Sequence, residues 1–287
     1  MPPGTAPLLC IDAPSLLYRA WFGLPDSIKG AGGEPVNALL GTANLVLRAV
    51  ADHAPRAVVL CDGAEAAAYR KAAYPPYHAD RPPVPGGLQH QWDLAPAFFS
   101  AFGWLWEHSE ELEADDLLGA FAQAEEAAGG SALLFTGDRD MFQCVTERVH
   151  VLYPQRGQDG PARVDPAAVR DRYGVEPAQL PDFIALRGDP SDGLPGAKGI
   201  GEKTAASLLR IHGTLDGVLA AAAQNEVAPR VTKPLTEDAD LLRTFLDVAT
   251  LRPPEVTLPA DTPTDLEGAA NAADAHGMRR LAERLRS

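Results

Sequence analysis

Short apolar runs alternate with longer segments of helical spacing through the first half of the chain. Four runs are aliphatic or β-branched and end at polar or turn residues, as buried parallel strands do: 6–12, 56–62, 131–138 and 148–154. Between them, apolar residues recur at helical intervals in the segments 37–53, 93–106 and 114–130. The alternation predicts an α/β fold with a mostly parallel sheet, whose functional sites lie beyond the carboxyl ends of the strands.

The strand pattern stops near Asp165, and a series of short segments with helical character follows. We therefore expect three regions: an α/β core at 1–164, a helical subdomain at 165–252 and a terminal segment at 253–287. Within the terminal segment, residues 253–275 are rich in Pro, Ala, Asp and Thr, which favours an extended connection. The final HGMRRLAERLRS predicts a basic helix, with four Arg against one Glu.

The composition excludes several classes of protein. With 46% hydrophobic and 22% charged residues, no unbroken apolar stretch of spanning length and no secretory signal, we expect a cytoplasmic monomer without a membrane partner. Three cysteines without CxxC spacing argue against a disulfide framework or a zinc knuckle. The net charge of −14 argues against a nucleic-acid partner if the acids are spread evenly over the surface, but not if they gather at one place.

Acidic residues stand where the predicted strands end. Asp12, Asp62 and Asp138 each close an apolar run, and Asp140 follows the last of them closely. Any one of these acids is equally well explained as a turn residue or as the N-cap of the next helix. Parallel strands, however, bring their carboxyl ends to one edge of the sheet, so three acids that converge there indicate a functional site.

Two further acidic groups stand out. The segment ELEADDLLG places Glu113, Asp115 and Asp116 at the start of a predicted helix, where acids are also favourable without any other role. Positions 113 and 116 share a helix face while Asp115 points elsewhere, so the group can reach more than one ion. The segment RGDPSDGLPG carries Asp189 and Asp192, which by themselves simply indicate turns.

So many carboxylates in one place would repel one another unless cations neutralise them. Without companion Cys or paired His ligands, carboxylate oxygens select hard ions such as Mg²⁺ or Mn²⁺. Two such ions about 3.5 to 4 Å apart hold a phosphate between them, turn a bound water into hydroxide and stabilise the departing oxygen. The acidic residues therefore predict phosphodiester hydrolysis.

Residues 63–91 fit neither the helix pattern nor the strand pattern, because they mix three Tyr with basic residues and five Pro. A connection of this length in a compact domain is usually functional or mobile. Its tyrosines, Tyr69, Tyr74 and Tyr77, lie among basic residues and prolines, which favours stacking on unpaired bases. Tyr18 is a fourth candidate for stacking, with burial as an equal alternative.

The segment GAKGIGEKTAASLL, at 196–209, places Gly199 and Gly201 in a tight turn before a predicted helix. Such a turn exposes backbone N–H groups and a helix N-terminus to an anion, and its carbonyls could hold a monovalent cation. It lacks the GxxxxGK[ST] of a Walker loop, and no buried strand precedes it as in a Rossmann fingerprint. A hairpin that grips a nucleic-acid phosphate fits the segment better.

Together these segments closely resemble the 5′ nuclease family, which comprises flap endonucleases, phage 5′ exonucleases and the N-terminal 5′ nuclease domain of bacterial DNA polymerase I. The matching stretches run from residue 8 to about residue 205: LLCIDAPSLLYRAWF, VVLCDG, YRKAAYPPYHADRP, ELEADDLLG, LLFTGDRDMFQ and RGDPSDGLPGAKGIGEKTA. The resemblance implies a PIN-like fold, with a helical arch or clamp at about 63–91 and a helix-three-turn-helix motif at about 183–212.

The resemblance also implies roles for single residues. All nine acidic positions of the family pattern are present and imply a metal site of two or more Mg²⁺ or Mn²⁺ ions held by Asp12, Asp62, Glu113, Asp115, Asp116, Asp138, Asp140, Asp189 and Asp192. The earlier acids chiefly serve the first ion, and the later ones serve the second. In relatives the helix-three-turn-helix holds duplex DNA, often with K⁺, which implies a K⁺ site on the backbone near Gly199, Ile200 and Gly201, and DNA contacts from Lys198, Gly199, Gly201, Lys203 and Thr204.

One position of the arch departs from the family pattern. Relatives generally have Lys where this chain has His78, in a pattern otherwise kept by Arg70, Tyr77 and Arg81. A Lys is a fixed positive charge, whereas an ordinary His side chain, with a pKa of about 6.5, is mostly neutral at neutral pH. The task of steadying the phosphate then falls to Arg70, Lys71 and Arg81. We expect His78→Lys to raise the single-turnover rate at neutral pH.

These observations predict a divalent-metal-dependent, structure-selective 5′ nuclease, acting as 5′-to-3′ exonuclease and flap endonuclease in DNA replication and repair. Its expected substrates are DNA with a 5′ flap, 5′ overhang, nick or gap, and an RNA primer in an RNA/DNA hybrid is a further candidate. Two alternatives remain: a DNA-junction binding protein that has lost catalysis, and an RNA-cutting nuclease of the PIN type. The full acidic set disfavours the first alternative, and the arch and GIGEKTA segments disfavour the second.

Overall fold

The computed structural model describes residues 6–155 and 160–287. At its centre is a six-stranded sheet with the order β3-β2-β1-β4-β5-β6. Its strands are β1 (Leu8–Asp12), β2 (Ala57–Gly63), β3 (Leu105–Ser109), β4 (Ala132–Phe135), β5 (Val149–Tyr153) and β6 (Ala162–Val164). The first five pair in parallel, and β6 joins β5 in the antiparallel sense. The predicted α/β fold with a mostly parallel sheet is confirmed.

The register of the sheet sets the acids on one edge. Asp12 lies opposite Cys61, so Asp12 and Asp62 end neighbouring strands. On the other side of β1, Ile11 lies opposite Phe135, and the chain leaves β4 immediately afterwards toward Asp138. The strand order reverses at β1, because the chain passes from β1 outward through β2 to β3 and then returns to β4 on its other side. Ligands bind α/β sheets at such a switch point, outside the carboxyl ends of the strands.

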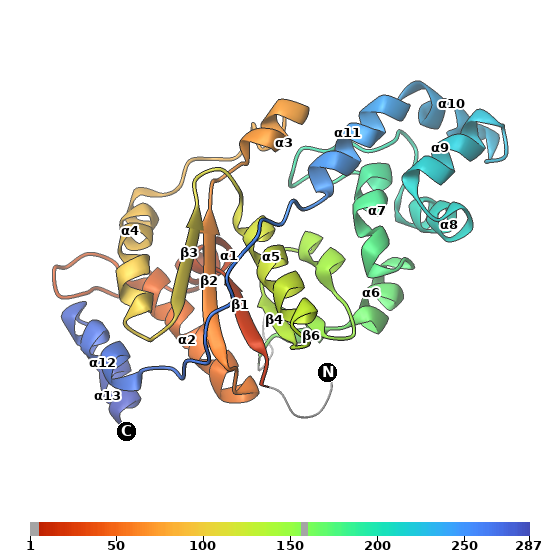
Figure 1. Cartoon of the computed structure of the whole chain (residues 1–287). Coiled ribbons are helices and arrows are strands. Elements are labelled where there is room, and N and C mark those ends of the chain that lie inside the picture. Colours follow the sequence, from red (N-terminus) through yellow and green to blue (C-terminus); the bar gives the residue numbers. More distant parts are fainter. Residues whose placement is uncertain (1–5, 156–159) are drawn as a thin grey trace.

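Helices cover both faces of the sheet (Figure 1). One face carries α1 (Ala13–Gly23), α2 (Asn37–His53) and α4 (Gly86–Ser100), and the other carries α5 (Ala114–Ala127). Alternate residues of β1 divide between the two cores: Leu9 and Ile11 pack with the first group, and Leu8 and Cys10 pack with α5. This is the period of two expected of a strand buried on both faces.

The helical region stands beside the sheet on the side of β6 (Figure 1). After the 3-10 turn η1 (Asp140–Cys144), it contains α6 (Pro166–Tyr173), the 3-10 turn η2 (Pro177–Gln179), α7 (Leu180–Arg187), α8 (Glu202–His212), α9 (Leu215–Ala223), α10 (Pro229–Glu237) and α11 (Ala239–Ala249). Residues 188–201 turn the chain between α7 and α8, as the predicted helix-three-turn-helix requires. Within the described ranges, no helix is both long and apolar enough to cross a membrane.

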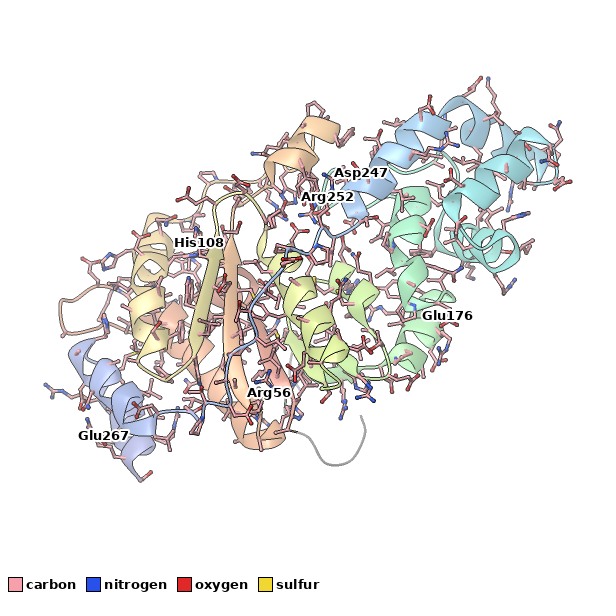
Figure 2. The ribbon with its side chains drawn as sticks, in the orientation of Figure 1. Arg56, His108, Glu176, Asp247, Arg252 and Glu267 are labelled. Atoms are coloured by element: carbon pink, nitrogen blue, oxygen red, sulfur yellow. The ribbon has the colours of Figure 1, made fainter. Side chains whose placement is uncertain are left out.

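From α11 the chain returns across the molecule as an extended segment, residues 250–265, which we call the strap (Figure 1). It leads to α12 (Leu266–Ala275) and α13 (Arg279–Arg286), which lie beside α4 at the opposite end from α8. Arg56, labelled in Figure 2, fastens the strap by donating from Nη1 to the Pro259 carbonyl oxygen at 2.7 Å and from Nε to Glu125 at 3.0 Å. The strap therefore connects α11 with α12, and Arg56 fastens it to the α/β core on the way.

Several predicted element boundaries are wrong. The helix expected at 93–106 is α4, which runs from Gly86 to Ser100, and residues 105–109 form the edge strand β3 instead. Helix α1 and strand β6 were not predicted, whereas the short helix α3 (Ala68–Ala73) lies within the helical arch expected at 63–91. In the segment expected to be extended, 253–275, the last ten residues form α12, whose N-cap Asp265 accepts a hydrogen bond from the Gly268 N–H at 2.8 Å.

Candidate active site

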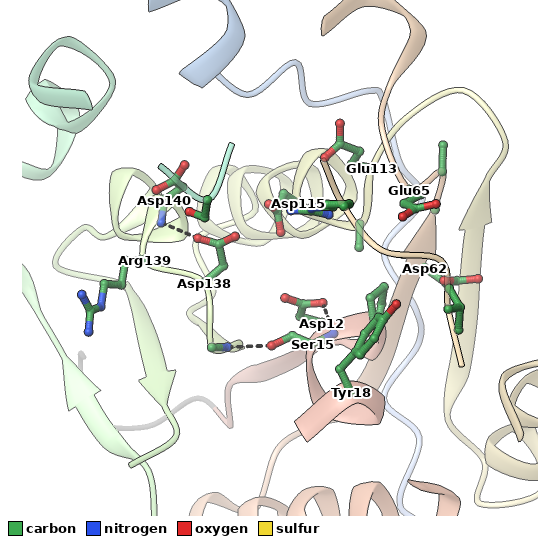
Figure 3. A pocket seen from close by; sticks show the side chains of 18 of the residues that line it. Asp12, Ser15, Tyr18, Asp62, Glu65, Glu113, Asp115, Asp138, Arg139 and Asp140 are labelled. Atoms are coloured by element: carbon green, nitrogen blue, oxygen red, sulfur yellow. Dashed lines mark hydrogen bonds between the residues drawn. The ribbon is translucent and has the colours of Figure 1, made fainter. Parts of the chain in front are cut away.

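A cavity opens beyond the carboxyl ends of β1, β2 and β4 (Figure 3). Seven of the nine predicted metal-site acids line it: Asp12, Asp62, Glu113, Asp115, Asp138, Asp140 and Asp189. Asp116 is fully buried on α5. Asp192 stands on the loop after α7, close to His78. The cavity therefore brings together acids that lie up to 177 positions apart in the sequence.

Asp12 is held at the base of the cavity by the first turn of α1 and by the loop after β4. Its Oδ1 accepts from the Ser15 N–H at 2.9 Å, which caps α1, and its Oδ2 accepts from the Thr136 hydroxyl after β4. The Ser15 hydroxyl accepts in turn from the Gly137 N–H at 3.0 Å. Burial raises the pKa of Asp12 to about 6, and the Asp138 and Asp62 charges add to this increase.

Three more acids face one another across the cavity. Figure 3 shows Asp115 and Asp138 directed into the same space as Asp12. Burial raises the pKa of Asp115, Asp138 and Asp140, and neighbouring carboxylates raise each of them further. Asp138 is fixed by accepting from the Asp140 N–H at 2.8 Å and donating its own N–H to Thr136 at 2.9 Å. This part of the site holds more negative charge than its surroundings compensate.

Glu113 and Asp116 differ because a buried guanidinium lies between them. Arg70 is 3% exposed and pairs with Glu113 at 2.9 Å and with Asp116 at 3.2 Å, and its Nε donates to the Val248 carbonyl oxygen at 3.0 Å. The Arg252 N–H of the strap also donates to Asp116 Oδ1 at 2.8 Å. Arg70 was expected to steady a phosphate, but here its donors serve two acids and a carbonyl. It is a positioning residue for Glu113.

The three arch tyrosines also make contacts with other residues of the protein. Tyr69 donates its hydroxyl to Asp116 at 3.0 Å, and Tyr77, which is 4% exposed, donates to Glu113 at 3.0 Å. Tyr74 packs edge-on against Phe245, with ring centroids 5.2 Å apart. Tyr18 lines the cavity instead and meets Trp92 edge-on at 5.9 Å. Of the four predicted stacking residues, Tyr18 therefore has the ring best placed to meet a ligand.

Asp62 is held by two side chains that the sequence did not indicate. Trp92 of α4 donates from Nε1 to Oδ1 at 3.1 Å, and His108 Nδ1 lies 2.8 Å from Oδ2. The register of β2 and β3 places His108 directly beside Asp62. If residues 105–109 had been recognised as a strand parallel to β2, its register would have placed His108 beside Asp62.

The later acids lie on the loop between α7 and α8. Asp189 accepts from the Ser191 N–H at 2.8 Å and lies 3.4 Å from Arg187 Nη2. Asp192 Oδ1 lies 3.0 Å from His78 Nε2 and 3.8 Å from Arg81 Nη2. The arch thus contacts the α7–α8 loop directly, through His78 and through Arg81, of which Arg81 was predicted to steady a phosphate.

Beyond this loop, the GIGEKTA segment forms the turn into α8. Gly199 has a positive φ of 79°, and Gly201 is the N-cap of α8, whose carbonyl oxygen accepts from the Thr204 N–H at 3.0 Å. Ile200 is buried and anchors the turn, while Lys198 and Lys203 are exposed on either side of it. The predicted anion-binding residues are therefore presented to solvent.

The donor set suits a hard divalent cation because it consists of carboxylates. Burial and mutual repulsion raise their pKa values, and a bound divalent cation would relieve that repulsion. Across residues 6–155 and 160–287, no three Asp, Glu, His or Cys side chains already stand close enough together to hold a metal ion. A bound ion would draw the carboxylates of the cavity inward, and Arg81 and Arg187 are the cations nearest to its later acids.

The chain matches the family described as "5'-3' exonuclease, N-terminal resolvase-like domain" over residues 7–174 and "5'-3' exonuclease, C-terminal SAM fold" over residues 175–271. A 5'-3' exonuclease of Streptomyces coelicolor is 38% identical over 295 residues, which cover 96% of this chain and 95% of that protein. DNA polymerase I of Mycobacterium tuberculosis is 39% identical over 209 residues, or 72% of this chain. The match spans 23% of the polymerase.

Solved structures share the fold at low sequence identity. T5 5'-exonuclease with divalent metal ions (zinc) bound has a TM-score of 0.69 at 16% identity, covering 97% of each chain. The catalytic core of Rad2 in complex with DNA substrate has a TM-score of 0.64 at 13% identity, covering 98% of this chain and 93% of the other. The fold and the acid-lined cavity define a nuclease. The chain belongs to the 5′-3′ exonuclease family, as its motifs predicted.

Proposed function

We propose that the protein is a divalent-metal-dependent, structure-selective 5′ nuclease that cleaves DNA at 5′ ends and at junctions between single-stranded and duplex segments. The observation that carries this proposal is the gathering of Asp12, Asp115, Asp138 and Asp140 in one cavity, with the pKa of each raised by burial. Such a group persists at neutral pH where cations neutralise it. Arg187, which lines the cavity, pairs with Glu202 at the start of α8 at 3.2 Å, and Glu202 adjoins the exposed Lys203.

Two Mg²⁺ or Mn²⁺ ions would be held by these four acids together with Asp189 and Asp192, and when bound they supply charge for the scissile phosphate and an activated water. The protein itself contributes orientation. Thr136 and Ser15 fix Asp12 and the loop after β4, and Arg70 fixes Glu113. Sites of this kind need ligands held in place before the substrate arrives.

Contacts to DNA would come from exposed groups around the cavity. Lys71 and Arg81 of the arch are exposed, and Arg81 also lines the cavity, so both can approach a phosphate. Tyr18 offers a ring for an unpaired base next to the acids. The N–H groups at the start of α8, with Lys198 and Lys203, suit a phosphate of the duplex, and K⁺ would sit on the carbonyls near Gly199.

Support for the nucleic-acid partner comes from the Rad2 core, which was solved with DNA substrate, and support for the metal comes from T5 5'-exonuclease, which was solved with zinc. We extend the proposal to a cytoplasmic monomer that acts on flaps, overhangs, nicks and gaps in replication and repair. RNA primers in RNA/DNA hybrids are included among its substrates.

Cleavage of a labelled 5′-flap substrate tests the proposal. We expect nucleotide-resolved cutting with Mg²⁺ or Mn²⁺, none with EDTA, and none by Asp115→Asn. Asp171→Asn, on the exposed surface of α6, is the matched control and should cut normally. Binding to the flap without cutting would favour the catalytically inactive junction-binding protein. Cutting confined to single-stranded RNA would favour the PIN-type alternative.

A further inference from the structure

One wall of the cavity is apolar and aromatic. It is formed by residues of α4, of β3 and of the chain that leads from the arch into α4, and we call this set the aromatic wall: Pro82, Val84, Trp92, Pro96 and Trp106. Trp92 and Pro96 are four positions apart and therefore share one face of α4. Trp106 lies two residues before His108 on β3, so both point to the side of the sheet that α4 covers.

Both indole rings of the wall are held in place by their neighbours. Trp106 stacks on the buried ring of Phe99, with centroids 6.2 Å apart and planes 3° apart. Trp92 donates from Nε1 to Asp62 at 3.1 Å and meets the ring of Tyr18 edge-on. Each indole nevertheless stays partly exposed and lines the cavity. Apolar and aromatic side chains with a few polar groups are the usual lining of a ligand pocket, and fixed rings reduce the entropic cost of binding.

The charges around the cavity decide which part of a nucleotide the aromatic wall can accept. Among the described residues that line the cavity, the arginines are Arg81 on the arch, Arg139 after β4 and Arg187 at the end of α7. To the same described lining, α4 and β3 contribute the carboxylate of Asp93 and no Lys or Arg. Asp62 adds a second carboxylate next to Trp92. These acids repel a phosphate, whereas a neutral nucleobase is free to stack on an indole ring.

We propose that the aromatic wall is a binding subsite for an unpaired nucleobase, namely that of the flap nucleotide on the 5′ side of the scissile phosphate, and that this base stacks on Trp106. The inference rests on the proposed nuclease function and deepens it. Trp92 contacts Asp62, so the wall begins one hydrogen bond away from a predicted metal ligand. The phosphate and the base of one nucleotide can therefore occupy the metal site and the wall together.

The subsite would recognise strandedness without reading sequence. The faces of a paired base are covered by its neighbours in the duplex, whereas an unpaired base offers a free face to an aromatic ring. Every base has such a face, so stacking on Trp106 tolerates all four. The wall would thus favour an unpaired nucleotide at the site of cleavage, which is one physical source of structure selectivity.

An abasic nucleotide in the flap tests the proposal through binding. All chains carry Asp115→Asn and are measured with Mg²⁺, so that the flap stays intact, and the affected nucleotide is identified from the position of the cut in the natural chain. Removing its base should weaken binding about fivefold to 150-fold, as expected for one stacked base. With Trp106→Leu added, removing the base should have little further effect.

Two further variants locate the base. Trp21→Leu is the matched control, because Trp21 is a partly exposed indole on α1 that packs against Gly87 outside the cavity lining, and it should keep the full abasic penalty. Tyr18→Leu should also keep most of that penalty. A penalty that persists in Trp106→Leu and disappears in Tyr18→Leu would overturn the proposal, because the base would then stack on Tyr18.

Photo-cross-linking decides the question even if Trp106→Leu does not fold, because it needs no change in the wall. A flap with 5-iodouracil at the same nucleotide should cross-link to Trp106 or Trp92, and recovery on neither residue refutes the subsite. A chain that cuts the flap but shows no abasic penalty loses the subsite and keeps the nuclease function. A chain that neither binds nor cuts the flap refutes both.

Discussion

Two pairs of carboxylates lie at the same edge of the sheet but have different neighbours: Glu113 and Asp116 at the start of α5, and Asp138 and Asp140 after β4. The first two face the buried guanidinium of Arg70, whereas the second two face other acids. The first pair shares one buried positive charge that the protein itself supplies, whereas the second pair needs a cation from outside. Acidic residues that belong to the same family pattern therefore have different roles in this structure.

The largest expected effect comes from Arg70→Ala. Removal of the guanidinium leaves Glu113 and Asp116 buried without a counter-charge, which should lower the free energy of unfolding by about 3 to 5 kcal/mol. Urea unfolding measures this directly. Arg81→Ala, at an exposed site, should change stability by less than about 0.5 kcal/mol. Equal effects of the two substitutions would show that Arg70 has no special structural role.

Asp138→Asn should separate activity from stability. Loss of a carboxylate from the uncompensated group should reduce cleavage by about 100-fold to 1,000-fold, in the range seen when one electrostatic group of an active site is removed. The same change should raise the thermal midpoint in EDTA, because it relieves repulsion with Asp115 and Asp140. Asp116→Asn should instead lower the midpoint, because it breaks the network around Arg70.

The stability of the metal-free chain should depend on pH through Asp12. Its pKa rises from 3.8 to about 6 on folding, so the folded state binds more protons than the unfolded state between these values. Stability in EDTA should therefore decrease as the pH rises from about 4 to 7, by about 2 to 3 kcal/mol from this group. Mg²⁺ or Mn²⁺ should remove most of the decrease. A flat profile in EDTA would contradict the raised pKa.

His78→Lys should give the smallest effect. A fixed positive charge on the arch should raise the single-turnover rate with Mg²⁺ severalfold at neutral pH, or about 1 kcal/mol in the barrier. Rapid-quench measurements of the single-turnover rate with Mg²⁺ test this expectation, and an unchanged or lower rate refutes the prediction.

Elements with an uninterrupted local signal were predictable from the sequence. Strand β4 is an unbroken apolar run, β2 is apolar up to its final Asp62 and Gly63, and α2 has apolar spacing from Asn37 to His53, so their patterns were sufficient. β3 was missed because its LWEHS sequence is half-exposed at the sheet edge and has no continuous apolar run. α12 was missed because its packing against α4 is decided by the fold and leaves little trace in an Ala-rich sequence.

In the site, too, some features could be predicted from local sequence and others could not. The strand ends located the acids, because a parallel sheet brings its carboxyl ends to one edge. The sequence did not reveal that Arg70 lies inside, since its partners Asp116 and Val248 are 46 and 178 positions away. A basic residue in a Pro- and Tyr-rich loop looks available for phosphate until its long-range partners are known.

The strap has a consequence for synthesis of the protein on the ribosome. Arg56 and the Pro259 carbonyl that it binds are 203 positions apart, and the Arg252 N–H reaches Asp116 from 136 positions away. At about 5 to 20 residues per second, roughly 10 to 40 s separate the translation of Arg56 from that of its partner. The sheet can form early, but the hydrogen bonding of Asp116 is complete only after Arg252 has emerged. A nascent chain therefore completes the hydrogen bonding around Asp116 only after residue 252 has left the ribosome.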